Sequence, residues 1–176
     1  MTLEPHDPRS VEVAARVREL VRQELPEVQV EHVGSTAVPG CEGKGVVDLV
    51  AGYPDGRLQA VKEALSRLGF QRQRGGHAFP EDRPMRTGSL EQGGALFQIH
   101  LHVIDRGSDE FVRLVEFRDR LRADPALAAS YVARKRELIE SGLTDGKEYS
   151  EAKGPFVAQA LVKSPEDHRG GHSPQE

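Results

Sequence analysis

The sequence predicts one domain of the α/β or α+β class, with a C-terminal part made of helices. Its 176 residues are enough to form one domain with a hydrophobic core, and too few for two domains to be the expected arrangement. Up to about residue 105, segments whose apolar residues recur with the period of a strand alternate with segments that show the period of a helix, and beyond that point only the helical period continues. The composition, 37% hydrophobic and 30% charged, is typical of a globular protein.

Charge and cysteine content narrow the class of protein. The net charge of -4 at pH 7 gives no overall attraction for a polyanion, so we expect no extended nucleic-acid surface. The single cysteine, Cys41, excludes an internal disulfide framework. The first residues lack the apolar stretch of a signal peptide, and no apolar run approaches the roughly 18 to 20 residues of a membrane span. We therefore expect a cytoplasmic protein that makes no membrane contact.

The first predicted elements are a helix and a strand. Ser10 is the expected N-cap of a helix that Pro26 ends, because the apolar residues between them fall on one helical face. Residues 28–33 alternate apolar and polar, which predicts a half-buried strand. In that strand His32 shares a face with Val28 and Val30.

A Gly34-Ser35-Thr36 turn follows this strand. Glycine permits the close approach of a ligand, and the free amides of such a turn can cradle a phosphate with the help of the two hydroxyls. The alternative is an ordinary turn that ends a strand. Lys44, in the loop that follows, either reaches the same phosphate or is a solvated loop lysine.

A predicted strand over residues 46–51 carries one carboxylate, Asp48, among apolar residues. A buried charge is costly unless it is paired or bound to a metal, so Asp48 needs a partner. Either a cap or an arginine supplies that partner, or Asp48 belongs to a site.

The middle of the chain is less regular. Residues 52–56 predict a turn, and residues 57–68 predict a helix that ends at Gly69. In residues 69–94 the pattern indicates a short strand near residues 70–74 and then irregular chain rich in arginine. This segment is either a basic flap over an anionic substrate or a solvated hairpin tip.

The strand predicted at residues 95–105 holds a pair of histidines. Strict alternation places His100 and His102 on one face and the apolar residues Ile99, Leu101 and Val103 on the other. Two residues of strand span roughly 6.6 Å, so both imidazoles can converge on one metal ion or one phosphate. The alternative is a pair of surface histidines.

Three helices are predicted after residue 107. Ser108 is the N-cap of the first and Asp124, followed by proline, starts the second. The third runs to about residue 162, and Gly154-Pro155 predicts a kink or a restart within it. Residues 1–163 are thus expected to form the domain, and residues 164–176 a disordered polar tail.

Several motifs lie in register over residues 11–162. They are EHVGSTAVPG at residues 31–40, Lys44, Val47-Asp48, HLHV at residues 100–103, FRDRLR at residues 117–122, Tyr131, Lys135, Tyr149 and Lys153. Together they resemble the GrpB family, which looks like a member of the nucleotidyltransferase superfamily. The resemblance implies an α+β fold, with a nucleotidyltransferase-like mixed β-sheet flanked by helices and a helical C-terminal part.

The resemblance also implies which residues form the site. It assigns Asp48 to a divalent metal, and His100 and His102 stand where the superfamily usually has a further carboxylate. Triphosphate contact and charge compensation fall on the turn and on three lysines: Gly34, Ser35, Thr36, Lys44, Lys135 and Lys153. Three further residues of the same motifs complete the candidate set: His32, Arg118 and Tyr149.

The metal set departs from the superfamily pattern, which places a second carboxylate two residues after the first. This chain has Val50 there. A transferase is expected to use Mg²⁺ or Mn²⁺, whereas one carboxylate with two imidazoles suits Zn²⁺ or another transition metal better.

The resemblance leaves more than one function open. The first hypothesis is an enzyme that transfers a nucleotidyl group from a nucleoside triphosphate to an unknown acceptor in a metal-dependent reaction, in which either histidine is alternatively the general base. The second is a non-catalytic nucleotide- or metal-binding accessory domain that has kept the fold and lost the transfer. A more distant third is metal-assisted phosphoester hydrolysis at the same residues.

Overall fold

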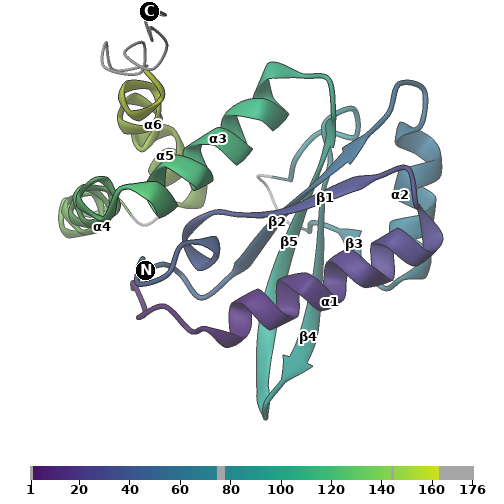
Figure 1. Cartoon of the computed structure of the whole chain (residues 1–176), viewed down its shortest axis with the longest axis horizontal. Helices are drawn as coiled ribbons and strands as arrows, with labels where there is room; N and C mark the ends of the chain where they lie inside the picture. Colours follow the sequence, from purple (N-terminus) through teal and green to yellow (C-terminus); the bar gives the residue numbers. More distant parts are fainter. Residues whose placement is uncertain (1, 75–77, 144, 163–176) are drawn as a thin grey trace, which may run out of the picture.

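A mixed five-stranded sheet in the order β1-β2-β5-β4-β3 organises the molecule (Figure 1). The computed structural model describes residues 2–74, 78–143 and 145–162. Strands β2 and β5 run parallel, and the other neighbouring pairs run antiparallel. The strands are β1 (Gln29–Val33), β2 (Val47–Tyr53), β3 (Gln71–Arg72), β4 (Met85–Gln92) and β5 (Ala95–Asp105). The predicted α+β class with a mixed sheet is confirmed.

Two helices, α1 (Arg9–Glu24) and α2 (Leu58–Arg67), cover one face of the sheet. Alternate residues of the central strands point into this core because side chains on a strand alternate between its faces. The core includes Val17 and Val21 of α1, Leu65 of α2, and Leu49 and Leu101 of the sheet, and each of these is fully buried.

The opposite face is covered over part of its area by α3 (Asp109–Ala123). Phe111 of α3 packs with Val33, Val50 and Ile104 from three strands of the sheet. The predicted cap is confirmed, because the Ser108 hydroxyl accepts a hydrogen bond from the Phe111 amide. The candidate residues of β2 and β5 lie on this same face, beside the area that α3 covers.

The C-terminal helices gather at one end of α3 (Figure 1). They are α4 (Pro125–Glu140), α5 (Gly146–Ala152) and α6 (Gly154–Leu161). Asp124 caps α4 through the amides of its first turn, as expected, and the chain restarts at Gly154. Tyr131 of α4 and Leu121 of α3 enclose Val38 and Cys41, so the helical part packs on the loop after β1. That contact brings helical side chains to the short 3-10 helix Ser35–Ala37.

Two local expectations were wrong. Ser10 lies inside α1, whose N-cap position is taken by Pro8, and the Asp7 carboxylate accepts from the Arg9 amide at 2.9 Å. The Ser10 hydroxyl is buried and donates to the carbonyls of Asp7 and Thr36 instead. Gly52 continues β2 rather than starting a turn. The Phe111 ring lies so close to it that a Cβ at this position would be 2.6 Å from the ring.

The arginine-rich segment is more ordered than its pattern indicated. Residues 85–92 form β4, and its neighbour Glu81 pairs with the guanidinium groups of Arg72 and Arg86. Arg83 pairs with Glu110 at the start of α3. These described arginines pair with carboxylates of the protein, so of the two alternatives the basic flap is not supported. Residues 75–77 and the predicted tail at residues 164–176 lie outside the described residues.

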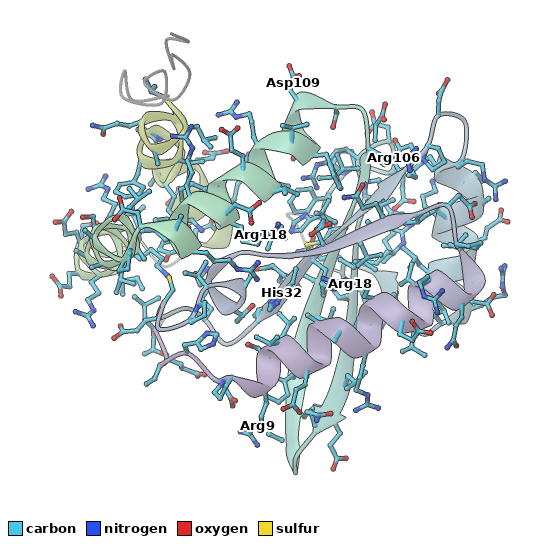
Figure 2. All side chains as sticks on the ribbon, viewed as in Figure 1. Arg9, Arg18, His32, Arg106, Asp109 and Arg118 are labelled. Atoms are coloured by element: carbon cyan, nitrogen blue, oxygen red, sulfur yellow. The ribbon has the colours of Figure 1, made fainter. Side chains whose placement is uncertain are left out.

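Strand β1 forms one edge of the sheet, and two arginines hold carbonyls of this strand. Arg18 of α1 donates to the Val30 carbonyl at 3.0 Å, and Arg118 of α3 donates to the His32 carbonyl at 3.0 Å. Figure 2 shows both guanidinium-bearing residues approaching this strand from the helices on either side. Arg118 also pairs with Glu31 at 2.7 Å, so α3 is tied to the strand that precedes the glycine turn.

Candidate functional site

Asp48 lies where three segments of the chain meet. It sits on β2 between Val33 of β1 and His100 of β5, which are its partners in the two neighbouring ladders. Gly34 follows Val33 directly, so the glycine turn begins against the Asp48 side chain. A Cβ at position 34 would lie 2.8 Å from Asp48 Oδ2, and Gly34 has φ 71° and ψ -171°, a region open essentially to glycine alone. Only a glycine lets the turn and the carboxylate approach this closely.

His100 and Asp48 form a side-chain pair. His100 Nδ1 lies 3.5 Å from Asp48 Oδ1, and the two side chains are 36% and 34% exposed. The parallel ladder fixes this pair, because residues opposite each other in neighbouring strands present their side chains to the same face. Both groups are therefore held together and remain open to a ligand.

His102 shares that face but makes different contacts. An arginine can only donate, so the 3.1 Å contact from Arg83 requires Nδ1 of His102 to accept and leaves its proton on Nε2. The ring of Phe79 meets the imidazole edge to face at 5.4 Å. Burial, helped by the charge of Arg83, lowers the pKa of His102 to about 4, while Asp48 acts to raise it. At neutral pH His102 is uncharged.

The Asp48–His100 pair fits a divalent cation better than the predicted trio does. Two ligands of one cation, each at about 2.1 Å, lie roughly 3 to 3.4 Å apart, which is near the observed separation. Within residues 2–74, 78–143 and 145–162, no three His, Cys, Asp or Glu side chains are arranged to hold an ion. A cation at the pair would thus take its other ligands from phosphate or water. The position two residues after Asp48 is closed to a second acid, because Val50 is fully buried under α3.

The hydroxyl of Ser35 is held by the helical part of the chain. Lys135 of α4 donates to Ser35 Oγ at 2.8 Å and to the carbonyl of Glu42. It also lies 3.5 Å from the sulfur of Cys41. Lys135 is 2% exposed, and this burial lowers the pKa of its ammonium group. Two segments about a hundred residues apart are joined here.

The side chains of Thr36 and His32 form a hydrogen bond with each other. The Thr36 hydroxyl donates to the Val46 carbonyl and lies 3.0 Å from His32 Nε2, so it accepts from that nitrogen. Both residues are buried. Burial, followed by the charge of Arg122, lowers the pKa of His32 to about 4. This pair lies within the turn region, and the Thr36 hydroxyl and His32 Nε2 already have partners within the protein.

Two further candidate lysines share one aromatic ring. The ammonium groups of Lys44 and Lys153 lie 4.2 Å and 4.6 Å from the centre of the buried Tyr149 ring. Burial and the charges of Lys44 and Lys135 lower the pKa of Lys153 to about 8, while Asp48 raises it. Burial likewise lowers the pKa of Lys44, and Asp48 is the main group that opposes this. These mutual effects place the three lysines and Asp48 in one electrostatic neighbourhood.

The three lysines differ from the other described lysines in their pairing. Lys62 and Lys147 each form an ion pair with a carboxylate. In the part of the chain that the structure describes, none of Lys44, Lys135 and Lys153 forms such a pair. The charge of Lys44 is opposed by Asp48 and Asp145 and that of Lys153 by Asp48, without a described salt bridge, and Lys135 contacts Ser35 of the turn directly. This arrangement is suited to an anion.

Sequence reasoning found most of these residues but missed several contacts. Arg118 is in the candidate set, yet its guanidinium group is used to hold β1 rather than facing Asp48. Arg83, the partner of His102, was noted only as part of an arginine-rich segment. The backbone carbonyl of Glu42, which accepts from Lys135, has no sequence signal at all.

Comparisons with known proteins agree with this architecture. The family model described as GrpB protein matches residues 1–163. The chain belongs to the GrpB family. One relative, UPF0157 protein SCO7215 of Streptomyces coelicolor, is 34% identical over 157 residues, which are 88% of this chain and 79% of the relative. The Glutamate-rich protein GrpB of Alkalihalophilus pseudofirmus is 28% identical over an alignment that covers 75% of this chain and 76% of that protein.

Solved structures extend the likeness of this GrpB-family chain to a wider fold. The crystal structure of conserved protein GrpB from Enterococcus faecalis matches with a TM-score of 0.68 at 22% identity, covering 90% of this chain and 94% of that one. Terminal uridylyl transferase 4 from Trypanosoma brucei, with bound dUTP, matches with a TM-score of 0.54 at 16% identity, covering 89% of this chain and 53% of that one. Cid1 in complex with its short product ApU gives 0.53 at 16% identity, covering 77% and 42%. The nucleotidyltransferase-like fold is thereby confirmed. Within the described residues, no helix has the length and apolar character that crossing a membrane requires.

Proposed function

We propose that this protein binds a nucleoside triphosphate with a divalent cation and transfers its nucleotidyl group to an acceptor. The observation that carries the proposal is the gathering of three lysines, none with a described salt bridge, around Asp48 and a Gly-Ser turn that abuts the Asp48–His100 pair. The turn offers free amides and a hydroxyl for phosphate oxygens. The bound dUTP of one fold neighbour supports a nucleoside triphosphate as the ligand class.

Each part of the site then has a role. The turn at Gly34-Ser35 holds phosphate oxygens, and Lys44 and Lys153 balance their charge from the side of Tyr149. Asp48 and His100 hold the cation, which when bound withdraws charge from phosphate oxygens. In the reaction the oxygen of an acceptor hydroxyl bonds to the α-phosphorus and releases its proton to water, the bond from that phosphorus to the oxygen bridging to the β-phosphate breaks, and pyrophosphate leaves. One carboxylate with one imidazole favours Mn²⁺ or Zn²⁺ over Mg²⁺ in this position.

Val50 favours a second candidate function, a non-catalytic nucleotide-binding domain. Val50 is fully buried in an apolar cluster with Phe111, so this chain has no room for a second acidic ligand beside Asp48. A site with one carboxylate holds a metal–nucleotide complex less firmly than a site with two. On this second proposal, binding persists and pyrophosphate release is absent.

Calorimetry of nucleotide binding tests the shared part of both proposals. We expect Asp48→Asn to weaken binding of ATP or UTP about tenfold or more in Mn²⁺, with little change when the metal is removed by chelation. Asp55→Asn is the matched control, because Asp55 is an exposed aspartate in the turn after β2 and should leave binding unchanged. Equal nucleotide affinity of the wild type and Asp48→Asn in Mn²⁺ would refute the site.

Pyrophosphate release separates the enzyme from the binding domain. Wild-type protein is incubated with labelled nucleotides, Mn²⁺ or Mg²⁺, and hydroxyl-bearing acceptors of several classes. Release that depends on both Asp48 and an acceptor supports transfer. Tight binding with no release for any nucleotide and acceptor supports the non-catalytic domain.

A further inference from the structure

Lys135 carries an ammonium group that could bind phosphate, but this group is buried among other parts of the protein. It lies on α4, is 2% exposed, and stacks its ammonium group 4.7 Å from the centre of the Tyr131 ring. An ammonium group carries three N–H donors, and three acceptors surround this one: Ser35 Oγ, Cys41 Sγ and the carbonyl of Glu42. Every donor of Lys135 is therefore engaged inside the protein.

The contact with Lys135 determines what Ser35 can do. Lysine can only donate, so Ser35 Oγ accepts in the 2.8 Å bond and its own O–H is left to donate elsewhere. Gly43 also packs closely on the serine, since a Cβ there would lie 2.8 Å from Ser35 Cβ. In the described part of the protein no acceptor takes the Ser35 O–H. The hydroxyl is thus fixed in place and oriented as a donor at a half-exposed position.

We propose that Lys135 is a positioning residue that presents the Ser35 hydroxyl as a hydrogen-bond donor to a phosphate oxygen, rather than a direct phosphate ligand. This inference rests on the proposed function, in which the turn binds a triphosphate. The charge on Lys135 also makes the Ser35 hydroxyl a stronger donor, because hydrogen bonds in a chain polarise one another. Lys44 and Lys153 then supply the direct charge contacts, since no described acceptor occupies their ammonium groups.

Chemical labelling of the wild-type protein tests the assignment without any mutation. Brief treatment with acetic anhydride, followed by mass spectrometry, is compared with and without ATP and Mn²⁺. We expect Lys44 and Lys153 to be acetylated in the free protein and protected by nucleotide, and Lys135 to be unreactive in both states. Acetylation of Lys135 in the free protein that nucleotide prevents would show direct contact and overturn the inference.

A double-mutant cycle tests the coupling to Ser35. We expect Ser35→Ala and Lys135→Met each to weaken ATP binding about tenfold, which is the effect of losing one charge-assisted hydrogen bond. The double variant should also bind ATP about tenfold more weakly than the wild type, because both substitutions remove the same interaction. Lys153→Met provides the comparison. Because Lys153 acts on phosphate independently of Ser35, the loss of affinity in Lys153→Met should multiply with the loss in Ser35→Ala. If the losses of ATP affinity in Lys135→Met and Ser35→Ala multiply in the same way, the inference is overturned.

The outcomes distinguish this inference from the proposal beneath it. Wild-type protein that binds no nucleotide overturns the proposed function and the positioning role with it. Wild-type binding with multiplying losses overturns the positioning role alone. If Lys135→Met does not fold, because it leaves the partly buried Glu42 carbonyl with only the weak Cys41 thiol as donor, the labelling of the wild-type protein decides the question.

Discussion

Replacing Gly34 by alanine should damage both the stability of the protein and its site. The residue has φ 71° and ψ -171°, and an L-residue in that region costs about 1 to 3 kcal/mol. The new Cβ would also lie 2.8 Å from Asp48 Oδ2 and 3.1 Å from Asp48 Cβ. The second contact is with an atom that the strand fixes, so the turn or β2 must shift. Together these effects predict a loss of about 2 to 4 kcal/mol in the free energy of unfolding.

Urea denaturation followed by circular dichroism measures that loss. For a protein of this size it corresponds to a fall of about 4 to 16 °C in the melting temperature. Gly40→Ala is the matched control, because Gly40 has φ 75° but a Cβ there would meet no atom within 4 Å. It should cost about 1 to 2 kcal/mol from backbone strain alone and leave nucleotide affinity unchanged. The reasoning is refuted if Gly34→Ala costs no more than Gly40→Ala, or if it binds Mn²⁺ and nucleotide as the wild type does.

Two further predictions concern pH. Lysine is charged below its pKa, so nucleotide affinity should fall as pH rises through about 8, the lowered pKa of Lys153 in the free protein. Calorimetry at several pH values should show a smaller fall for Lys153→Arg, which keeps its charge; an equal fall in both proteins would exclude Lys153 as the cause. His32 has a folded-state pKa of about 4 against 6.5 for a free histidine, so between these values the unfolded chain binds more protons and the free energy of unfolding rises with pH. Acidification from pH 6.5 to 4 should therefore cost about 2 to 3 kcal/mol at this residue, and urea denaturation of His32→Gln should show a drop smaller by that amount than the wild type shows. The same drop in both would contradict the argument.

Local patterns in the sequence predicted the elements of the fold well where one physical effect dominates. The alternation of residues 95–105 gave β5 its observed bounds and placed His100 on the correct face, because one face of that strand is buried in a continuous core. Asp124-Pro125 was identified as a helix start because proline is favoured at the first helical position, and Asp124 is the N-cap of that helix. The mixed class of the sheet came from the family resemblance and not from these patterns.

Tertiary contacts account for the failures. Ser10 has the right chemistry for a cap, but the carbonyl of Thr36 in another segment gives its hydroxyl a buried partner. Gly52 has the composition of a turn, yet the ring of Phe111 needs a residue without a side chain at that point of β2. Neither fact is visible within ten residues of the position concerned.

The candidate site was predicted in identity more than in arrangement. The sequence pointed to Asp48 as a buried carboxylate in need of a partner; the structure supplies His100 at 3.5 Å but leaves the Asp48 side chain 34% exposed, so its burial was overestimated. The sequence treated His102 as equivalent to His100. In the structure, however, the guanidinium group of Arg83, in the loop before β4, is hydrogen-bonded to His102 Nδ1. The sequence also treated three lysines alike, although Lys135 is enclosed with its donors engaged while Lys44 and Lys153 share the Tyr149 ring. Such distinctions depend on which residues meet after folding.

The two arginines on β1 have a consequence for behaviour at high protein concentration. An edge strand with free carbonyls is a template on which a second molecule can add a strand and begin to aggregate. Here Arg18 and Arg118 already occupy carbonyls of that edge. Loss of either arginine would open part of the template while leaving the rest of the sheet in place. The same contacts that anchor the helices to β1 therefore also protect the protein from edge-to-edge polymerisation.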